Sequence, residues 1–227
     1  MRNPTAVPIE PSGSRLLRID VFRELRRDIL SCRIAPGTEL REAELAERFT
    51  TSKSPVRDAL SRLVQEGLVT VMPRQGYRVT PISLKDVNDM FEYRAVLESA
   101  SARIAASTAS AEALRALDRF RRYDHKAHPD GFPSYNRAFH QALAQLSGNA
   151  RLAGALSSQI DQMDRVVAMS VDAIRGHDPA RVVQEHGHII DALQLRDGRR
   201  AGALLSRHVL QARKRVHDAL SRAAVVE

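Results

Sequence analysis

Apolar residues in the first third of the chain recur with helical spacing in three short segments. Residues 17–32, residues 42–49 and a segment that starts at Ser54-Pro55 each present one apolar stripe. In the third segment the stripe falls at i, i+3, i+4, i+7 and i+8, and it comprises Val56, Ala59, Leu60, Leu63 and Val64. A hydroxyl residue followed by proline is typical of a helix start, so we expect Ser54 as the N-cap and Pro55 as the first helical residue.

The pattern changes to strand, turn and strand directly after the third segment. Gly67 suits the left-handed position that ends a helix. The run 68–71 then leads through a turn with Pro and Gly, residues 72–76, to a second run at 77–80. Three helices followed by a hairpin predict a winged helix-turn-helix.

After Pro81 the chain shows helical periodicity only, which predicts an all-α helical bundle. We expect its helices at about residues 84–109, 111–127, 133–147, 150–174, 178–196 and 199–223. The predicted fold is therefore mainly α. It is divided into a flexible Pro- and Gly-containing tail at 1–14, a winged helix-turn-helix DNA-binding domain at 15–81 and an all-helical domain at 82–227.

Length and charge agree with two domains and a polyanionic partner. The chain has 227 residues and a formal net charge of +8. Cys32 is the only cysteine, so no disulfide can form within the chain. The sequence has neither the apolar core of a signal peptide nor the roughly 18 apolar residues of a membrane span. We expect a cytoplasmic protein with no membrane partner.

Basic and polar residues mark two places in the first domain. The start of the third helix can enter the major groove and reach base edges, and it carries Lys53, Ser54 and Arg57. The hairpin tip, which suits a wing that touches DNA, carries Arg74, Gln75 and Gly76. By charge alone these residues are equally consistent with ordinary surface cations, or with a nucleoid-associated protein that has no sequence preference.

The segment ILSCRIAPGTELREAELAERFTTSKSPVRDALSRLVQEGLVTVMPRQGYRV resembles the N-terminal module of the GntR family of bacterial transcription regulators, over about residues 18–80. The resemblance implies that the recognition helix contacts double-stranded DNA through Ser52, Lys53, Ser54 and Arg57, and the wing through Arg74, Gln75 and Gly76. The family often has Arg where Lys53 stands, and Ala43 occupies a position that is basic in some members. We expect a homodimer on a pseudo-palindromic operator.

Three histidines fall on or beside apolar helix stripes in the second domain: His140, His186 and His208. Each one alone is usually a hydrogen-bonded core histidine, but a divalent metal ion would satisfy all three at once. Asn136 lies four residues before His140 on the same helix face, so its amide oxygen could be a fourth ligand. Such a nitrogen and oxygen donor set suits zinc, nickel or another first-row ion.

The segments EYRAVLESASARIAA, YNRAFHQALAQLSGN, EHGHIIDAL and ALLSRHV resemble the FCD effector domain of FadR-like GntR proteins. The resemblance implies a metal site at Asn136, His140, His186 and His208, with Asn136 in place of the usual Asp. Arg94 lies on an inward-facing stripe and needs an anion. That anion is either Glu98, four residues on, or, as the resemblance implies, the carboxylate of a small organic acid that also coordinates the metal.

These observations predict a ligand-responsive transcriptional regulator, most often a repressor in this family, with a small carboxylate as its effector. A second hypothesis makes the metal ion itself the signal. A third, a metal-dependent hydrolase, is disfavoured because no Asp or Glu is recognisably placed as a general base, since Glu185 points off the His186 face. The sequence also has no nucleophile motif or glycine-rich phosphate loop. We therefore expect no enzyme activity.

Overall fold

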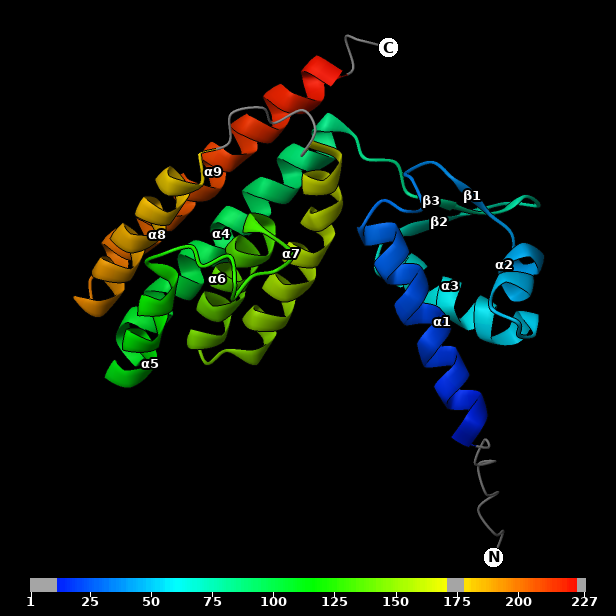
Figure 1. Cartoon of the computed structure of the whole chain (residues 1–227), viewed down its shortest axis with the longest axis horizontal. Helices are drawn as coiled ribbons and strands as arrows, with labels where there is room; N and C mark the ends of the chain where they lie inside the picture. Colours follow the sequence, from blue (N-terminus) through cyan, green and yellow to red (C-terminus); the bar gives the residue numbers. More distant parts are fainter. Residues whose placement is uncertain (1–11, 171–177, 224–227) are drawn as a thin grey trace, which may run out of the picture. The chain divides into compact units, whose positions relative to one another are not determined.

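The chain divides into two compact units, Met1–Pro81 and Ile82–Glu227, in the computed structural model. The structure describes residues 12–170 and 178–223. The predicted class is confirmed: three helices and a small sheet form the first unit, and helices alone form the described part of the second (Figure 1). Within the described residues no helix has the length and hydropathy of a membrane span.

The first unit combines a helix-turn-helix with a three-stranded sheet. Its elements are α1 (Ser12–Leu30), β1 (Glu39–Leu40), α2 (Glu42–Arg48), α3 (Lys53–Gln65), β2 (Val69–Met72) and β3 (Gly76–Val79). The sheet is antiparallel with the order β1-β3-β2. The strand β1 was not expected, because two residues are too few to show a period. It adds an edge to the predicted hairpin by pairing Leu40 with Tyr77.

The core of the first unit lies where α1 crosses α3, and Leu25, Leu60 and Leu63 are fully buried there. The stripe predicted for the third helix is confirmed, since its first four members are buried and Val64 packs against them. The helix ends at the predicted glycine. Gly67 has a φ of +72°, and the Leu68 amide donates to the Leu63 carbonyl at 3.0 Å.

Two predicted boundaries in the first unit were wrong. The helix α3 begins at Lys53, with Ser52 rather than Ser54 at the N-cap, so Pro55 is its third residue. Proline is tolerated there because the first-turn amides have no partner within the helix. Residues 12–14, assigned above to the flexible tail, belong to α1, and residues 1–11 lie outside the described part of the chain.

The second unit is a bundle in which α4 lies along α9 and also contacts α6 and α7, while α8 packs on α9 (Figure 1). Its elements are α4 (Leu84–Thr108), α5 (Ala111–Arg115), the 3-10 helix η1 (Ala116–Phe120), α6 (Phe132–Leu146), α7 (Ala150–Ser170), α8 (Pro179–Gln194) and α9 (Gly198–Ala223). The end of the helix predicted at 150–174 falls outside the described residues.

The helix predicted at 111–127 was wrong in its second half. The chain tightens into η1 and leaves helical structure after Phe120. The Phe120 carbonyl accepts a hydrogen bond from the Tyr135 hydroxyl at 2.6 Å, and the Phe120 ring packs edge-on against Tyr135 and Phe139. Contacts from α6, distant in sequence, therefore outweigh the local helical pattern.

The close packing of α4 on α9 depends on Gly202. A Cβ at this position would lie 2.9 Å from Ser99 Oγ and 3.0 Å from the Ser99 carbonyl oxygen, whereas a Cβ at Gly154 on α7 would meet open space. We expect Gly202→Ala to lower the free energy of unfolding by about 1–3 kcal/mol through overpacking. Gly154→Ala should raise it by about 0.5–1 kcal/mol through helix propensity. Urea denaturation measures both free energies of unfolding. A higher free energy of unfolding in both variants would contradict the tight contact at Gly202.

Candidate metal centre and DNA-contact surface

Three histidines from three helices converge in the second unit. His140 is on α6, His186 on α8 and His208 on α9, and each is at most 4% exposed. One ring nitrogen of each lies within 4.8 Å of those of the other two. The inward positions expected from the apolar stripes are confirmed. Whether these residues bind metal stays a prediction.

Two carboxylates fix two of the imidazoles through their Nδ1 atoms. His140 Nδ1 bonds to Glu98 Oε2 at 2.7 Å, and His208 Nδ1 bonds to Glu185 Oε2 at 2.6 Å. A carboxylate accepts, so each Nδ1 carries the proton and each Nε2 keeps its lone pair. This tautomer, with an acidic partner behind the ring, is the one found in metal-binding histidines.

His186 is held by a hydroxyl instead. The Tyr135 hydroxyl donates to the Phe120 carbonyl, so it accepts from His186 Nδ1 at 3.1 Å. The imidazole stacks on Phe139 with 3.7 Å between ring centroids. Its Nε2 atom is buried without a hydrogen-bond partner among the described residues. Such an atom costs about 1–3 kcal/mol if left unsatisfied, and a metal ion would satisfy it. The three histidines therefore fit a first-row divalent ion.

Electrostatics keep the cluster ready to bind a cation. Burial, with the positive charge of Arg94, lowers the pKa of His140 to about 4, and burial lowers the pKa of His186 well below its usual value. Burial alone would raise the pKa of Glu98, but the charges and hydrogen bonds of Arg94 and His140 together outweigh it, and the pKa falls to about 2. At neutral pH these imidazoles are therefore uncharged and Glu98 is ionised, as metal coordination requires.

Arg94 has the protein partner that the sequence offered for it. Its Nε donates to Glu98 Oε1 at 2.5 Å, and both side chains are buried. Because the other oxygen of Glu98 bonds to His140, this one carboxylate joins Arg94 to the histidine cluster. Arg94 can still contact a ligand although it is paired with Glu98, because it also lines the adjoining cavity.

A cavity of about 330 Å³ adjoins the cluster and is lined mainly by apolar side chains. Its polar wall consists of Arg94, Asn136, His140, His208 and Arg215. The structure thus brings Asn136 to the same cavity as two of the histidines, whereas His186 lies outside the cavity wall. A mostly apolar space with a few polar groups on one side suits a small organic ligand.

Sequence reasoning missed several groups around this site. Glu185 was set aside because it lies off the His186 face of α8, but that same direction takes it to His208 on α9. Arg215 follows His208 by seven residues, a helical spacing that would have placed both on one face of α9. Tyr135 gave no signal beyond its place in an apolar stripe. Its role depends on the unexpected turn after Phe120.

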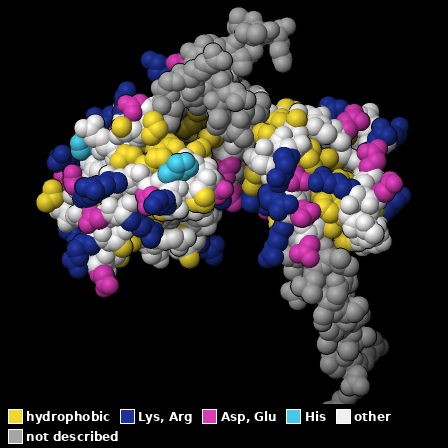
Figure 2. All heavy atoms as spheres, in the orientation of Figure 1, with side chains coloured by type: hydrophobic (Ala, Val, Ile, Leu, Met, Phe, Trp, Pro, Cys, Tyr) yellow, Lys and Arg dark blue, Asp and Glu magenta, His cyan; other side chains and the backbone are white. Residues whose placement is uncertain are grey.

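The residues predicted to contact DNA are mostly on the surface of the first unit. Six of the seven are exposed, namely Ser52, Lys53, Ser54, Arg57, Arg74 and Gln75. Figure 2 shows Asp and Glu side chains interspersed with Lys and Arg over this unit, so its surface is not uniformly basic. Arg57, for example, makes a two-pronged ion pair with Glu42.

Gly76 has a structural reason to be glycine. Its φ is +105°, and a Cβ there would lie 2.9 Å from the Leu40 carbonyl oxygen of β1. A side chain at this position would therefore push β1 away from β3. The neighbouring Arg74, at the tip of the hairpin, also has a positive φ, of 63°. The contact to β1 accounts for this glycine without any contact to DNA.

Two family models match the chain: "Bacterial regulatory proteins, gntR family" at residues 17–79 and "FCD domain" at residues 89–211. The HTH-type transcriptional repressor RspR of Escherichia coli is 32% identical over 206 residues, which cover 89% of this chain and 87% of that protein. The Escherichia coli McbR/YncC structure has a TM-score of 0.72 at 21% identity, covering 89% and 97% of the two chains. A transcriptional regulator GntR from Rhodococcus sp. RHA1 has a TM-score of 0.68 at 26% identity, covering 88% and 96%.

Removing the Glu98 carboxylate should be costly, because it leaves the buried Arg94 guanidinium without its counter-ion. We expect Glu98→Ala to lower the free energy of unfolding by about 3–5 kcal/mol. The matched control is Asp89→Ala on the same helix, which breaks an ion pair with Lys85 whose acid is 58% exposed. It should cost at most about 1 kcal/mol. Equally small losses in chemical denaturation would show that the Arg94–Glu98 pair is not buried as described.

Proposed function

The chain belongs to the GntR family of bacterial regulatory proteins with an FCD domain, and we propose that its helical unit binds a small organic acid through a bound divalent metal ion. The protein is a DNA-binding transcriptional regulator and not an enzyme. The observation that carries the proposal is the buried Nε2 atom of His186, which has no hydrogen-bond partner among the described residues and lies in a cluster of three buried imidazoles.

In this proposal the metal is held by His140, His186 and His208 through Nε2, with the Asn136 amide oxygen as a fourth ligand. Glu98 and Glu185 stand behind two of the rings, orient them and raise their basicity. Zinc and nickel suit this donor set best. Asn136 supplies no negative charge where relatives with Asp would, so we expect a weaker site than one with a carboxylate ligand.

The effector proposed for the cavity is a small carboxylate that shares the metal with the protein. Within the chain, Glu98 already balances the positive charge of Arg94. Arg215, on α9, is a second cation in the cavity wall and would supply the positive charge that the carboxylate of the effector needs. Guanidinium groups bind carboxylates in a forked geometry. The apolar walls, which include Phe91 and Met163, would take the rest of the acid.

The first unit is proposed to read a pseudo-palindromic operator with Ser52, Lys53, Ser54 and Arg57 at the start of α3 and with Arg74, Gln75 and Gly76 in the wing. Two copies of α3 would enter successive major grooves on one side of the duplex. Binding of the acid changes the relative placement of the two copies and so the affinity for the operator. We propose repression, the activity named for the similar RspR protein.

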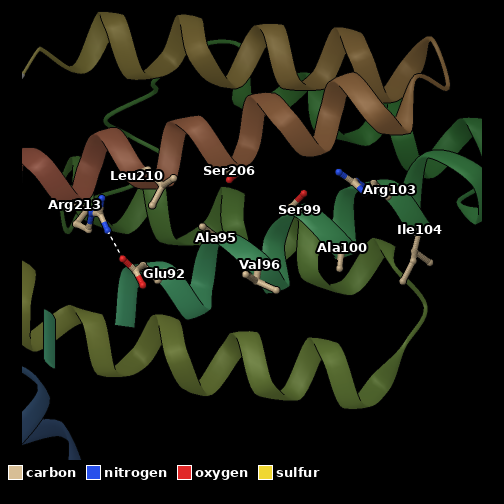
Figure 3. A pocket seen from close by; sticks show the side chains of 10 residues that line it. All are labelled: Glu92, Ala95, Val96, Ser99, Ala100, Arg103, Ile104, Ser206, Leu210 and Arg213. Atoms are coloured by element: carbon tan, nitrogen blue, oxygen red, sulfur yellow. Dashed lines mark hydrogen bonds and ion pairs between the residues drawn. The ribbon is translucent and has the colours of Figure 1, made fainter. Parts of the chain in front are cut away.

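A second copy of the chain is proposed to dock on an open groove formed by α4 and α9, whose lining residues are drawn in Figure 3. On α4 an acidic residue, Glu92, and a basic residue, Arg103, flank Val96, which is 68% exposed, and Ala100. A twofold axis near residue 98 would place Glu92 opposite Arg103 of the other copy and Val96 opposite Ala100. The face is thus complementary to itself, as a symmetric dimer requires.

Elemental analysis of protein purified without chelator tests the metal proposal. We expect about one ion per chain, and we expect His186→Gln and His208→Gln to lose it. His188→Ala, which removes an exposed histidine on the same helix as His186, should keep it. No ion in the folded wild-type protein, even after incubation with zinc, nickel and manganese, would contradict the proposal.

The same preparations separate the leading proposal from metal sensing. Operator DNA is first selected from random duplexes with the wild-type protein. If an organic acid is the signal, small carboxylates change operator affinity only in the metal-loaded protein. If the metal ion is the signal, chelation alone changes operator affinity. Metal sensing is retained as the second candidate because the three histidines converge on one point without any organic acid.

The dimer face is tested by Val96→Asp, which would bury a carboxylate against the apolar Ala100 of the other copy. We expect the dissociation constant of the dimer to rise by at least about tenfold, or about 1.4 kcal/mol. Leu195→Asp, at a residue that is 71% exposed outside this face, serves as the control and should leave the dimer intact. Sedimentation equilibrium measures both. If Val96→Asp leaves the dimer intact, the dimer forms through another surface.

A further inference from the structure

We infer that Glu42 positions Arg57 to read a guanine, and that it thereby sets operator specificity without contacting DNA itself. The inference rests on the proposed role of Arg57 as a DNA contact. It assigns a further residue, in a different helix from the one that enters the groove, to the discrimination between DNA sequences.

The contact between the two side chains is two-pronged and defined at the level of atoms. Arg57 Nε donates to Glu42 Oε1 at 2.9 Å, and Arg57 Nη2 donates to Glu42 Oε2 at 2.7 Å. The arginine side chain is 62% exposed and the glutamate 21%. A partly buried carboxylate thus holds the side chain of an arginine that faces solvent.

Glu42 is itself held in place by the sheet. It is the first residue of α2 and follows β1, whose buried Leu40 pairs with Tyr77 of β3. The hydrogen bond from Arg57 is the main cause that lowers the pKa of Glu42, and Tyr77 adds to it. The carboxylate is therefore ionised at neutral pH, and its backbone is anchored at the point where the paired strand β1 leads into α2.

Glu42 binds one edge of the Arg57 guanidinium and leaves the edge that would contact a base free for DNA. A guanidinium has five N–H groups, and Glu42 takes the one on Nε and one on Nη2. The end formed by Nη1 and the second Nη2 hydrogen remains for a ligand. Two N–H groups in this arrangement match the N7 and O6 acceptors of guanine in the major groove. A flexible arginine would have to adopt this orientation on binding, whereas the ion pair fixes it beforehand.

A simple charge effect is the rival explanation, and the chain offers a matched control for it. Glu44 is also an acid of α2, with a side chain 65% exposed and a weak contact to Arg41 at 3.6 Å. Glu42→Ala and Glu44→Ala each remove one negative charge from the same helix. Both should strengthen binding to non-specific DNA, but only the loss of Glu42 should change which base is preferred.

The experiment uses the full-length protein and an operator selected with it from random duplexes. Each guanine is replaced in turn by 7-deazaguanine, which lacks the N7 acceptor, and affinities are measured by fluorescence anisotropy. At the guanine read by Arg57 the wild-type protein should lose roughly 5- to 100-fold in affinity, the range for a forked contact. Arg57→Ala identifies this position, because the variant is insensitive to the replacement there.

For Glu42→Ala we expect the loss at that guanine to shrink to within about twofold, in line with a contact that is no longer oriented. Glu42→Gln should give an intermediate loss, since an amide has a single acceptor oxygen, and it covers the case in which the alanine variant fails to fold. Glu44→Ala should show the same loss of affinity at that guanine as the wild-type protein. In the Arg57→Ala background, Glu42→Ala should have no further effect on base preference.

Two outcomes would overturn the inference, and they are distinguishable. If Arg57→Ala abolishes discrimination at one guanine but Glu42→Ala and Glu42→Gln leave it at the wild-type level, Glu42 does not position Arg57. If Arg57→Ala leaves operator affinity and base preference unchanged, Arg57 is not a DNA contact. That result removes Arg57 from the proposed contact set as well.

Discussion

The helical unit depends on one constraint: three imidazoles buried in one place must each satisfy two ring nitrogens. Glu98, Tyr135 and Glu185 each take one nitrogen of one ring, and they come from α4, α6 and α8. The remaining nitrogens face a common space, and that of His186 has no partner among the described residues. A packed apolar core would exclude such groups, because unpaired buried polar atoms are costly. Binding of a cation, as proposed here, would satisfy them.

The same helices connect the cluster to the rest of the unit. Glu98 bonds to both Arg94 and His140, so a ligand that engages Arg94 would act on the carboxylate that orients a metal ligand. The helix α4 packs closely on α9 at Gly202, and these two helices also form the groove proposed for the second copy. An effector in the cavity would therefore act on helices that also carry the dimer face. This is the physical path by which we expect ligand binding to reach the DNA-binding units.

Much of the fold could be predicted from sequence, because a helix that buries only one face has apolar residues at regular helical spacing. The stripe of α3 and the inward histidines are examples. Features that depend on distant contacts could not: the end of the helix at Phe120 is fixed by Tyr135, and the two-residue strand β1 exists only through its pairing with β3. For the site, the sequence indicated which imidazoles are buried. It gave no signal for Tyr135 and misjudged Glu185, since hydrogen bonds between helices depend on how the helices are rotated against one another.

Anomalous diffraction at the zinc absorption edge, from crystals of protein loaded with zinc, tests the central claim most directly. The account predicts one strong peak in the helical unit, within coordination distance of Nε2 of His140, His186 and His208. A peak instead at Asp161 and Asp164, the acidic pair that binds Arg137, would contradict it. So would three well-ordered imidazoles with no ion between them.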